Sequence, residues 1–349
     1  LRKSGICTLP VKKIAVQYIL EITYRMTSSM KQMYPWYRGI HNLSTWAKLF
    51  VILGLILVLV RVFRTRSAAS KEAFSAGQPQ SQTGTPNGAL KIIEGPQIYD
   101  DFYADIYDSL TYFQKKNEFE MGTIKKSTPF TNESIALDIG SGTGHHVAQL
   151  KEIGFSQAMG IEKSQAMVRV AEKKYPKNKY VLGDAMQRSV FRQNTFTHIT
   201  MFYFTVYYFE DKTALFANCF AWLKPGGTMV IHLADKDMFD PILPPANPLV
   251  SLTPQRYAKK RITTSRVTFN NFKYDANFEL DGDKATFVEK FTNKDDGKPF
   301  RKNNHNMFMD DLDKIESAAT GVGFIIKGKN DMIKAEYEYQ YLYVFQKPE

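Results

Sequence analysis

Alternating glycines between residues 137 and 144 are the feature of this 349-residue chain best suited to bind a ligand. The stretch reads Leu-Asp-Ile-Gly-Ser-Gly-Thr-Gly, with an apolar run before it and a helix-like segment from His146 onward. Glycine has no Cβ, so its backbone can adopt positive φ and come close to a ligand, while the following helix directs free N–H groups toward it. The pattern therefore predicts a buried strand, a nucleotide-binding turn and a helix.

The spacing of these glycines separates two ligand classes. In the dinucleotide fingerprint G-x-G-x-x-G, the third glycine lies three residues after the second. That position is His145 in this chain, and the third glycine is Gly144. The turn therefore departs from the pattern of NAD-binding proteins, although an NAD-dependent oxidoreductase stays an alternative prediction.

Two acidic residues follow at positions suited to a nucleoside. Residues 157–162 read as a second strand that ends in Glu162, and residues 179–186 read as a third strand and its exit, which contains Asp184. An acid at such a strand end can accept hydrogen bonds from both ribose hydroxyls. Glu162 is therefore the predicted ribose ligand, and Ser164 is placed to cap the helix that follows it.

Aromatic residues follow the predicted fourth strand, residues 196–204, which reads as a buried central strand. Tyr207 and Tyr208 come directly after it, where parallel sheets of this kind form their ligand crevice. These tyrosines predict an apolar or cation-binding acceptor pocket, in which they act by positioning or by cation–π contact. The alternative interpretation is that both are core aromatics.

Later motifs complete a resemblance to a known family. A predicted amphipathic helix ends in Leu-Lys-Pro-Gly-Gly at residues 223–227, a strand follows at 228–233, and residues 324–326 and 339–345 read as closing strands. Together with the glycine turn and the two acids, these motifs make residues 98–347 resemble class I S-adenosylmethionine (SAM)-dependent methyltransferases of the small-molecule type. The resemblance implies an α/β fold with a Rossmann-like, doubly wound, seven-stranded sheet whose last strand is antiparallel.

The resemblance also implies a cofactor and its ligands. SAM is the expected cofactor, no metal is expected, and the protein mainly positions and desolvates the reactants. The Asn/Asp-Pro motif of families that methylate adenine or glutamine is missing after the fourth strand, which argues against those acceptors. The predicted cofactor-binding residues are Tyr107 on a helix near the start of the domain, Asp138, Gly140, Ser141, Gly142 and Gly144 in the turn, Glu162 at the ribose, and Asp184, Ala185 and Met186 at the adenine.

Residues 240–306 read as an insertion that covers the crevice. Alternating stretches at 267–269, 276–280 and 285–289, the last two joined by Asp281-Gly282-Asp283, predict an antiparallel β flap. His305 lies near the end of this insertion, and His232 lies at the end of the fifth strand. Each is a candidate for a general base, with a structural role as the alternative, so the catalytic residue stays unassigned among these histidines, Tyr207 and Tyr208.

The first 97 residues are expected to lie outside the catalytic domain at 98–349. Residues 1–42 read as a basic arm, 43–63 as a single transmembrane anchor and 64–97 as a flexible linker. Arg61, Arg64 and Arg66 directly after the apolar span predict a catalytic domain that faces the cytosol. The anchor makes a lipid acceptor an alternative to a soluble small molecule, and a SAM-binding module without turnover is a further alternative.

The net charge of +11 does not indicate a nucleic-acid partner. Residues 1–75 hold 12 Lys or Arg against two acids, whereas the rest of the chain holds 34 basic and 33 acidic residues. The predicted globular part is therefore nearly neutral, unlike a surface that binds phosphates. Two cysteines, Cys7 in the basic arm and Cys219 on an apolar helix face, cannot form a disulfide framework or a metal cluster.

Overall fold

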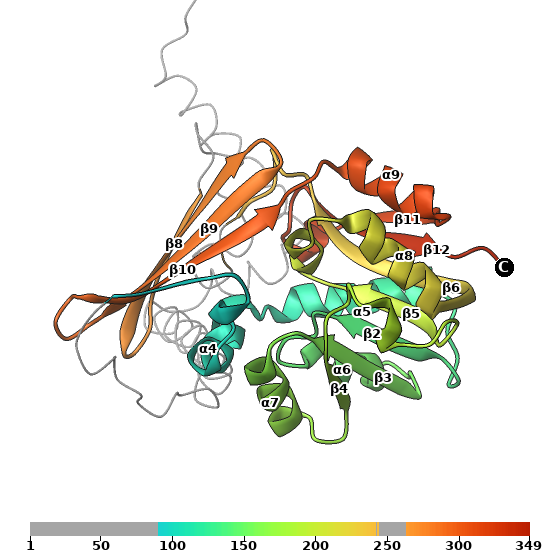
Figure 1. Ribbon diagram of the computed structural model, residues 1–349, viewed down its shortest axis with the longest axis horizontal. Coiled ribbons are helices and arrows are strands. Elements are labelled where there is room, and N and C mark those ends of the chain that lie inside the picture. Colours follow the sequence, from blue (N-terminus) through green and yellow to red (C-terminus); the bar gives the residue numbers. More distant parts are fainter. Residues whose placement is uncertain (1–89, 242, 244–262) are drawn as a thin grey trace, which may run out of the picture. The chain divides into compact units, whose positions relative to one another are not determined.

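The computed structural model describes residues 90–241, 243 and 263–349, and Figure 1 shows their arrangement. The predicted basic arm, the predicted anchor at residues 43–63 and the linker up to residue 89 lie outside the described residues. In the part of the chain that is described, no helix has the length and apolar content needed to cross a membrane. The described residues form two β-sheets with helices around them.

A seven-stranded sheet forms the centre of the domain, in the order β11-β12-β6-β5-β2-β3-β4. Strand β12 runs antiparallel to its neighbours β6 and β11, whereas the other neighbouring pairs are parallel. This arrangement confirms the predicted doubly wound sheet with an antiparallel last strand. The strands are β2 (Ile135–Ile139), β3 (Gln157–Glu162), β4 (Lys179–Leu182), β5 (Phe196–Met201), β6 (Leu223–Ala234), β11 (Ile325–Asp331) and β12 (Gln340–Gln346).

Helices cover both faces of this sheet, because successive side chains of a strand point to opposite faces. On β6, Met229 and Ile231 pack in a core cluster with helices α8 (Lys212–Trp222) and α9 (Leu312–Val322). Val230 between them packs in another cluster with α5 (Gln114–Ser127) and α6 (His145–Glu152). Helix α7 (Gln165–Lys174) contacts β3 and β4, and its cap is the predicted one: the backbone N–H of Met167 donates to Ser164 Oγ at 3.1 Å.

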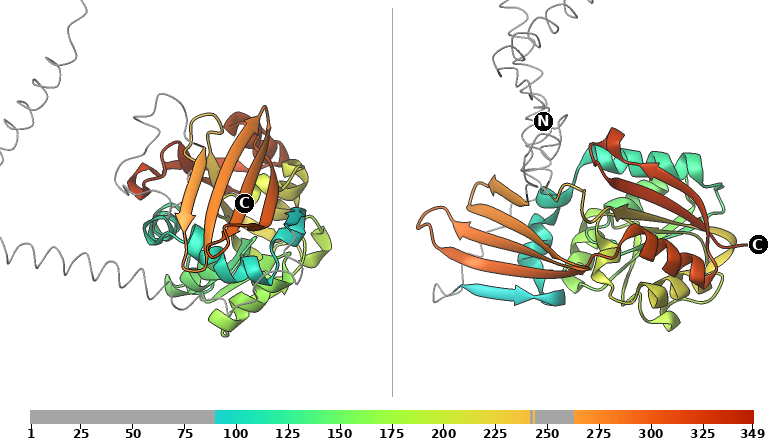
Figure 2. Two further views of the ribbon diagram at one scale, coloured as in Figure 1. Left: turned by 90° about the vertical axis from the view of Figure 1, so that its left-hand side faces the viewer. Right: turned by 90° about the horizontal axis from the view of Figure 1, so that it is seen from above.

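A second, five-stranded sheet has the order β1-β10-β9-β8-β7 and lies beside the larger sheet in Figures 1 and 2. Helix α4 (Asp101–Thr111) packs on it through a cluster that joins Phe272 and Phe291 to Tyr103 and Leu110. The predicted hairpin is present, with Asp281 paired to Lys284 around Gly282, although its strands are longer than expected. The strands are β1 (Lys91–Glu94), β7 (Thr264–Thr268), β8 (Phe272–Asp281), β9 (Lys284–Asn293) and β10 (Pro299–Phe308).

Strand β1 corrects the predicted boundaries of the linker and the insertion. The linker was expected to continue to residue 97, but Lys91–Glu94 pairs in parallel with Arg301–Asn304 of β10. Ile93 is the buried residue of this strand, and one inward apolar residue gives too weak a pattern to predict a strand. Strand β10 also continues to Phe308, two residues beyond the expected end of the insertion at 306.

Two local expectations need correction around the central strands. Strand β5 ends at Met201 rather than at residue 204, because Tyr203 takes φ 55° and turns the chain into the short 3-10 helix Thr205–Tyr208. Strand β6 already begins at Leu223, which pairs with Phe196, and pairing resumes at Thr228 opposite His198. The Lys-Pro-Gly-Gly segment thus lies in an irregularity of the ladder, where Gly226 takes φ 73°.

Candidate active site

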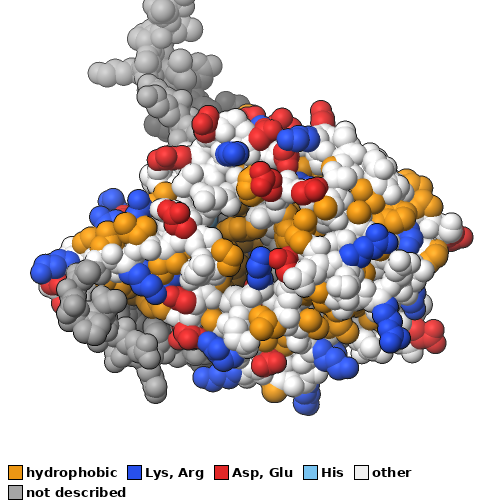
Figure 3. Space-filling view, viewed as in Figure 1, with side chains coloured by type: hydrophobic (Ala, Val, Ile, Leu, Met, Phe, Trp, Pro, Cys, Tyr) orange, Lys and Arg blue, Asp and Glu red, His pale blue; other side chains and the backbone are white. Residues whose placement is uncertain are grey.

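A cavity of about 600 Å³ lies at the carboxyl ends of the parallel strands, with walls from both sheets. Figure 3 shows a hollow near the centre of the face viewed, with hydrophobic side chains on its wall. Its volume lies within the range of small-molecule pockets, about 300–1,000 Å³. Seven of the ten predicted cofactor-binding residues line it: Tyr107, Gly140, Gly142, Glu162, Asp184, Ala185 and Met186.

The glycine turn has the predicted left-handed backbone, with φ of 67° at Gly140, 53° at Gly142 and 86° at Gly144. The first two glycines line the cavity, and a Cβ on Gly140 would come within 2.6 Å of Thr205 Cγ2. Gly144 is needed for a different contact, because its Cβ would lie 2.4 Å from the Tyr180 hydroxyl. Gly144 lines neither this cavity nor the smaller one beside it, and the contact that the structure shows for it is this close packing against Tyr180.

The carboxylate of Glu162 is fixed at the edge of the turn. Its Oε2 accepts from the backbone N–H of Gly142 at 3.0 Å, and its Oε1 accepts from the backbone N–H of Ser164 at 2.9 Å. Burial raises the pKa of this carboxyl group. Each carboxylate oxygen has a second lone pair, so Glu162 can still accept the two ribose hydroxyls that the sequence predicted.

The residues predicted to line the adenine follow β4, and hydrogen bonds fix their positions. Asp184 bonds Lys163 Nζ at 2.7 Å and accepts from the backbone N–H of Met186 at 3.0 Å. Burial opposes ionisation of Asp184, but these hydrogen bonds outweigh it and lower the pKa. Asn218 on α8 donates to the carbonyls of Ala185 at 2.9 Å and Met186 at 3.0 Å, which fixes the backbone of this wall.

A smaller cavity of about 50 Å³ contains the other predicted turn residues, Asp138 and Ser141. Asp138 accepts from Thr200 Oγ1 at 2.7 Å, and burial raises its pKa to about 6. Ser141 Oγ has no hydrogen-bond partner among the described residues. It lies over Gly160, where a Cβ would meet it at 2.2 Å. Tyr107 lines both cavities and therefore stands at their junction.

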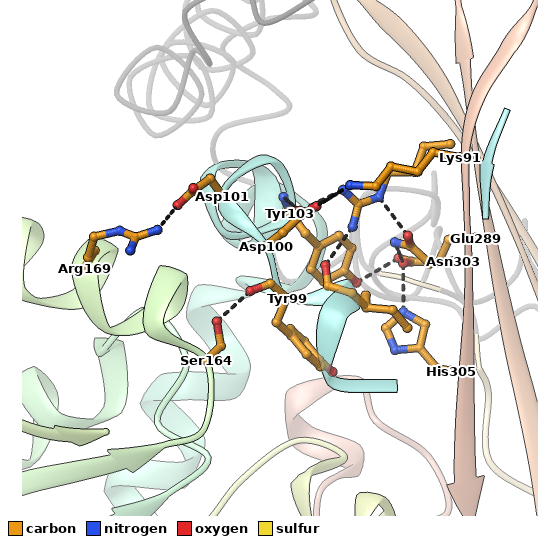
Figure 4. A network of polar contacts seen from close by, with 12 residues as sticks. Lys91, Tyr99, Asp100, Asp101, Tyr103, Ser164, Arg169, Glu289, Asn303 and His305 are labelled. Atoms are coloured by element: carbon orange, nitrogen blue, oxygen red, sulfur yellow. Dashed lines mark hydrogen bonds and ion pairs between the residues drawn. The ribbon is translucent and has the colours of Figure 1, made fainter. Parts of the chain in front are cut away.

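Tyrosines form a further part of the cavity wall. The Tyr99 ring makes edge contacts, with centroid distances of 5.5 Å to Tyr103, 6.5 Å to Tyr107 and 6.2 Å to Tyr208. Ser164 Oγ donates to the Tyr99 carbonyl at 2.6 Å, which ties this segment to the cofactor side of the cavity (Figure 4). The cavity wall is thus rich in aromatic faces, which favour apolar or cationic ligands.

A buried carboxylate orients a histidine and a tyrosine at this wall. Glu289 on β9 accepts from Tyr103 at 2.9 Å and Asn303 at 2.8 Å and bonds His305 Nε2 at 2.8 Å (Figure 4). It also accepts from the Tyr274 hydroxyl at 2.7 Å. Burial opposes ionisation of Glu289, but His305 and the hydrogen bonds outweigh it and lower its pKa.

The bond to this carboxylate requires a proton on Nε2 of His305, because a carboxylate only accepts. His305 Nδ1 lies 2.9 Å from the Tyr208 hydroxyl, and in the neutral imidazole with Nε2 protonated it accepts from that hydroxyl. The structure therefore brings together Tyr208 and His305, which the sequence named separately.

Two other predicted catalytic candidates lie outside the cavity wall. The Tyr207 hydroxyl donates to the carbonyl of Ala234 at 3.1 Å and accepts from its N–H at 2.7 Å, in the fully buried core. His232 Nε2 lies 2.9 Å from Gln340 Oε1, and burial lowers the pKa of His232 to about 4. Tyr207 joins the 3-10 helix to β6 and His232 joins β6 to β12, and neither side chain lines the cavity.

Sequence reasoning missed Glu289, Tyr99 and Tyr103. Glu289 had a recognisable signal, because it alternates with Phe287 and Phe291 and is thus an acid at an inward position of a strand. In the described residues no cluster of three or more His, Cys, Asp or Glu side chains could hold a metal ion.

Comparisons with known proteins agree with this geometry. The family described as "Methyltransferase domain" matches residues 137–231. A phosphoethanolamine N-methyltransferase of Plasmodium falciparum is 26% identical over 149 residues, 40% of this chain and 51% of that protein. A demethylmenaquinone methyltransferase of Chlorobaculum tepidum is 31% identical over 107 residues, 31% of this chain and 43% of that protein. The chain thus spans about half the length of the curated relatives it matches.

A solved structure shows the same fold with SAM bound. It is an amino pentose methyltransferase from Micromonospora echinaspora, and it covers 71% of this chain and 97% of its own at a TM-score of 0.52 and 17% identity. The glycine turn and Glu162 of this chain present backbone and carboxylate groups suited to such a nucleoside. Residues 137–231 therefore match the methyltransferase family, and the described domain shares the fold of a class I, SAM-dependent methyltransferase, as the resemblance in the sequence predicted.

Proposed function

We propose that this chain transfers a methyl group from SAM to an amine nitrogen of a small-molecule acceptor. The observation that carries the proposal is one cavity that joins the predicted nucleoside ligands on one side to Tyr208 and His305 on the other. Bound SAM would supply the activated methyl group on its sulfonium, so the residues of the chain need only position, desolvate and deprotonate the acceptor.

The charge of the cavity wall favours a cationic acceptor. Among the described residues of this wall the acids outnumber the single lysine, Lys163, which is paired with Asp184. A cavity lined by one sign of charge concentrates ligands of the other sign, and tyrosine faces stabilise ammonium groups. The acids of the wall are Glu162, Asp184, Glu210, Asp211 and Glu289.

Tyr208, His305 and Glu289 would remove the proton that an ammonium acceptor must lose. The Tyr208 oxygen takes a proton from the acceptor nitrogen as its own proton passes to His305 Nδ1. The imidazolium formed is then stabilised by the Glu289 carboxylate at 2.8 Å. Such assistance typically accelerates a reaction about 10²- to 10⁴-fold.

The names of two similar proteins support an amine acceptor. The Plasmodium falciparum relative is named an N-methyltransferase of phosphoethanolamine, and the structure with bound SAM is named an amino pentose methyltransferase. Both names describe a nitrogen-bearing acceptor. The acidic and aromatic cavity wall of this chain supports a nitrogen acceptor, and experiment must identify the rest of the molecule.

Two measurements on the full chain test the proposal. Calorimetric titration should show binding of S-adenosylhomocysteine and none of NADH, and the opposite result would make the chain an oxidoreductase. Labelled SAM incubated with a cell extract should then mark the fraction of small amines. Binding without any transfer of label would mean a SAM-binding module, and label in the lipid fraction would mean a lipid acceptor.

We also propose that residues 43–63 anchor the chain in a membrane with the catalytic domain on the cytosolic side. The support is the apolar span between Lys48 and Arg61 and the arginines that follow it. The full chain should stay with membranes during carbonate extraction, and its domain should be open to protease added from the cytosolic side. Release by carbonate would contradict the anchor.

A further inference from the structure

A buried lysine lines the smaller cavity and takes no part in the proposed methyl transfer. Lys116 on α5 is 2% exposed and lines this cavity together with Asn117, which is also 2% exposed. Asn117 Oδ1 has no hydrogen-bond partner among the described residues. A buried ammonium group is costly unless it is paired, so its presence calls for a physical reason.

Glu120 supplies the negative charge that pairs with this buried ammonium group. Lys116 Nζ lies 3.0 Å and 2.9 Å from the two carboxylate oxygens of Glu120, one turn further along α5. Glu120 Oε2 also bonds His146 Nε2 at 2.9 Å, so this carboxylate is shared between two basic groups. Since an ammonium group has three N–H donors, Lys116 keeps one donor beyond the two that Glu120 takes. The pair holds Lys116 in place without using all of its donors.

The smaller cavity adjoins the predicted SAM site. Tyr107, Gly140, Gly142 and Tyr203 line both cavities, and Lys116 Nζ lies 5.7 Å from the centre of the Tyr203 ring. The predicted adenine wall and ribose ligand line only the larger cavity. A nucleoside bound there and continued across the glycine turn reaches the smaller cavity with its amino-acid end.

We infer that Lys116 binds the α-carboxylate of the SAM amino-acid moiety. The inference rests on the proposed function and extends it to a residue that no cofactor motif of the sequence contains. Asp138 on another wall of the same cavity suits the α-ammonium group, so the cavity offers one charge of each sign to a zwitterion. Glu120 and His146 act as positioning residues that hold Lys116 in place.

The test compares ligands that differ only in the carboxylate. Affinities of S-adenosylhomocysteine and of its decarboxylated analogue are measured by calorimetry on the full chain. The wild-type protein should bind the complete ligand about 10- to 100-fold more tightly, as expected for a hydrogen bond to a charged group. In Lys116→Met this ratio should fall to about one, mainly through weaker binding of the complete ligand. The neighbouring Lys115→Met is the matched control and should keep the wild-type ratio, because Lys115 pairs with Glu336 at the surface.

Lys116→Met leaves Glu120 buried without its lysine, which costs stability. A second variant therefore provides the test if Lys116→Met does not fold. The double variant Lys116→Met/Glu120→Gln removes both charges and should also show a ratio of about one, whereas Glu120→Gln alone should keep the preference for the carboxylate. Persistence of the wild-type ratio in folded Lys116→Met or in the double variant would overturn this inference alone. Failure of the wild-type protein to bind S-adenosylhomocysteine would overturn the proposed function and this inference with it.

Discussion

Replacing Asp138 by asparagine should stabilise the ligand-free protein at neutral and alkaline pH while weakening SAM binding. Asp138 is 2% exposed, and burial raises its pKa from 3.8 to about 6. Its ionised form is therefore disfavoured in the fold. The stability that protonated Asp138 contributes is fully present below pH 4 and is lost as the pH rises through 6. Asparagine keeps the shape and an acceptor for Thr200 Oγ1 but cannot ionise.

The size of the effect follows from the two pKa values. A difference of about two pH units at about 1.4 kcal/mol each gives about 3 kcal/mol at pH 8 and less than about 1 kcal/mol near pH 4. The weaker hydrogen bond from Thr200 to a neutral oxygen offsets about 1 kcal/mol of this gain. We therefore expect Asp138→Asn to raise the free energy of unfolding by about 2 kcal/mol at pH 8.

Urea unfolding of the full chain at pH 8 and pH 4, without ligand, measures this difference. Asp237→Asn is the matched control, since Asp237 is exposed and its replacement should change stability little at either pH. An equal effect of Asp138→Asn at both pH values would refute the reasoning, because the gain must disappear where Asp138 is protonated. S-adenosylhomocysteine should meanwhile bind the variant more weakly, since the ionised group is the one that suits its α-ammonium.

Three further predictions concern the acceptor wall and the scaffold. Tyr208→Phe should lower kcat about 100-fold with unchanged affinity for S-adenosylhomocysteine, because it breaks the bond to His305 Nδ1; steady-state kinetics that show full kcat would remove Tyr208 from the reaction. His198→Gln should reduce the loss of folding stability on acidification. Burial lowers the pKa of His198 to about 4 in the folded protein, whereas the unfolded chain takes up this proton from pH 6.5 downward. The free energy of unfolding of the wild type should then fall by about 3 kcal/mol more than that of the variant between pH 7 and 4. Arg301→Met should cost about 2–4 kcal/mol in urea unfolding, since Arg301 is 3% exposed and bonds both oxygens of Asp100 at 2.7 and 2.8 Å; a cost no larger than that of Lys302→Met would contradict this.

The cofactor side of the site could be predicted from sequence because its motifs are local. Each combines a strand, a turn and a helix within a few residues, so the spacing alone places Gly140, Glu162 and Asp184 at neighbouring strand ends. Gly144 shows the limit of such reasoning. It belongs to the same motif, but its close neighbour is Tyr180 from another strand, which the motif does not contain.

The residues on the acceptor side of the cavity could not be predicted from sequence, because their contacts depend on the register of strands β9 and β10. Tyr208 and His305 are 97 residues apart, and their bond requires β10 to lie against β9 in one register. In that register Asn303 pairs with Glu289, and His305 lies two residues further along the same face. Tyr207 and Tyr208 are adjacent in a short 3-10 helix, where one residue decides whether the ring enters the core or the cavity.

Because the cavity is divided between two sheets, related enzymes can differ in their acceptor without differing in their nucleoside contacts. The predicted SAM ligands follow β2, β3 and β4, whereas Glu289 and His305 come from β9 and β10. Under the proposed function, selection on the second sheet can therefore alter which molecule receives the methyl group while the nucleoside contacts stay intact. Exchanging residues 264–308 between related enzymes would be the corresponding engineering route. The segment from Tyr99 to Tyr107 should be exchanged together with them, because its rings touch both halves of the cavity.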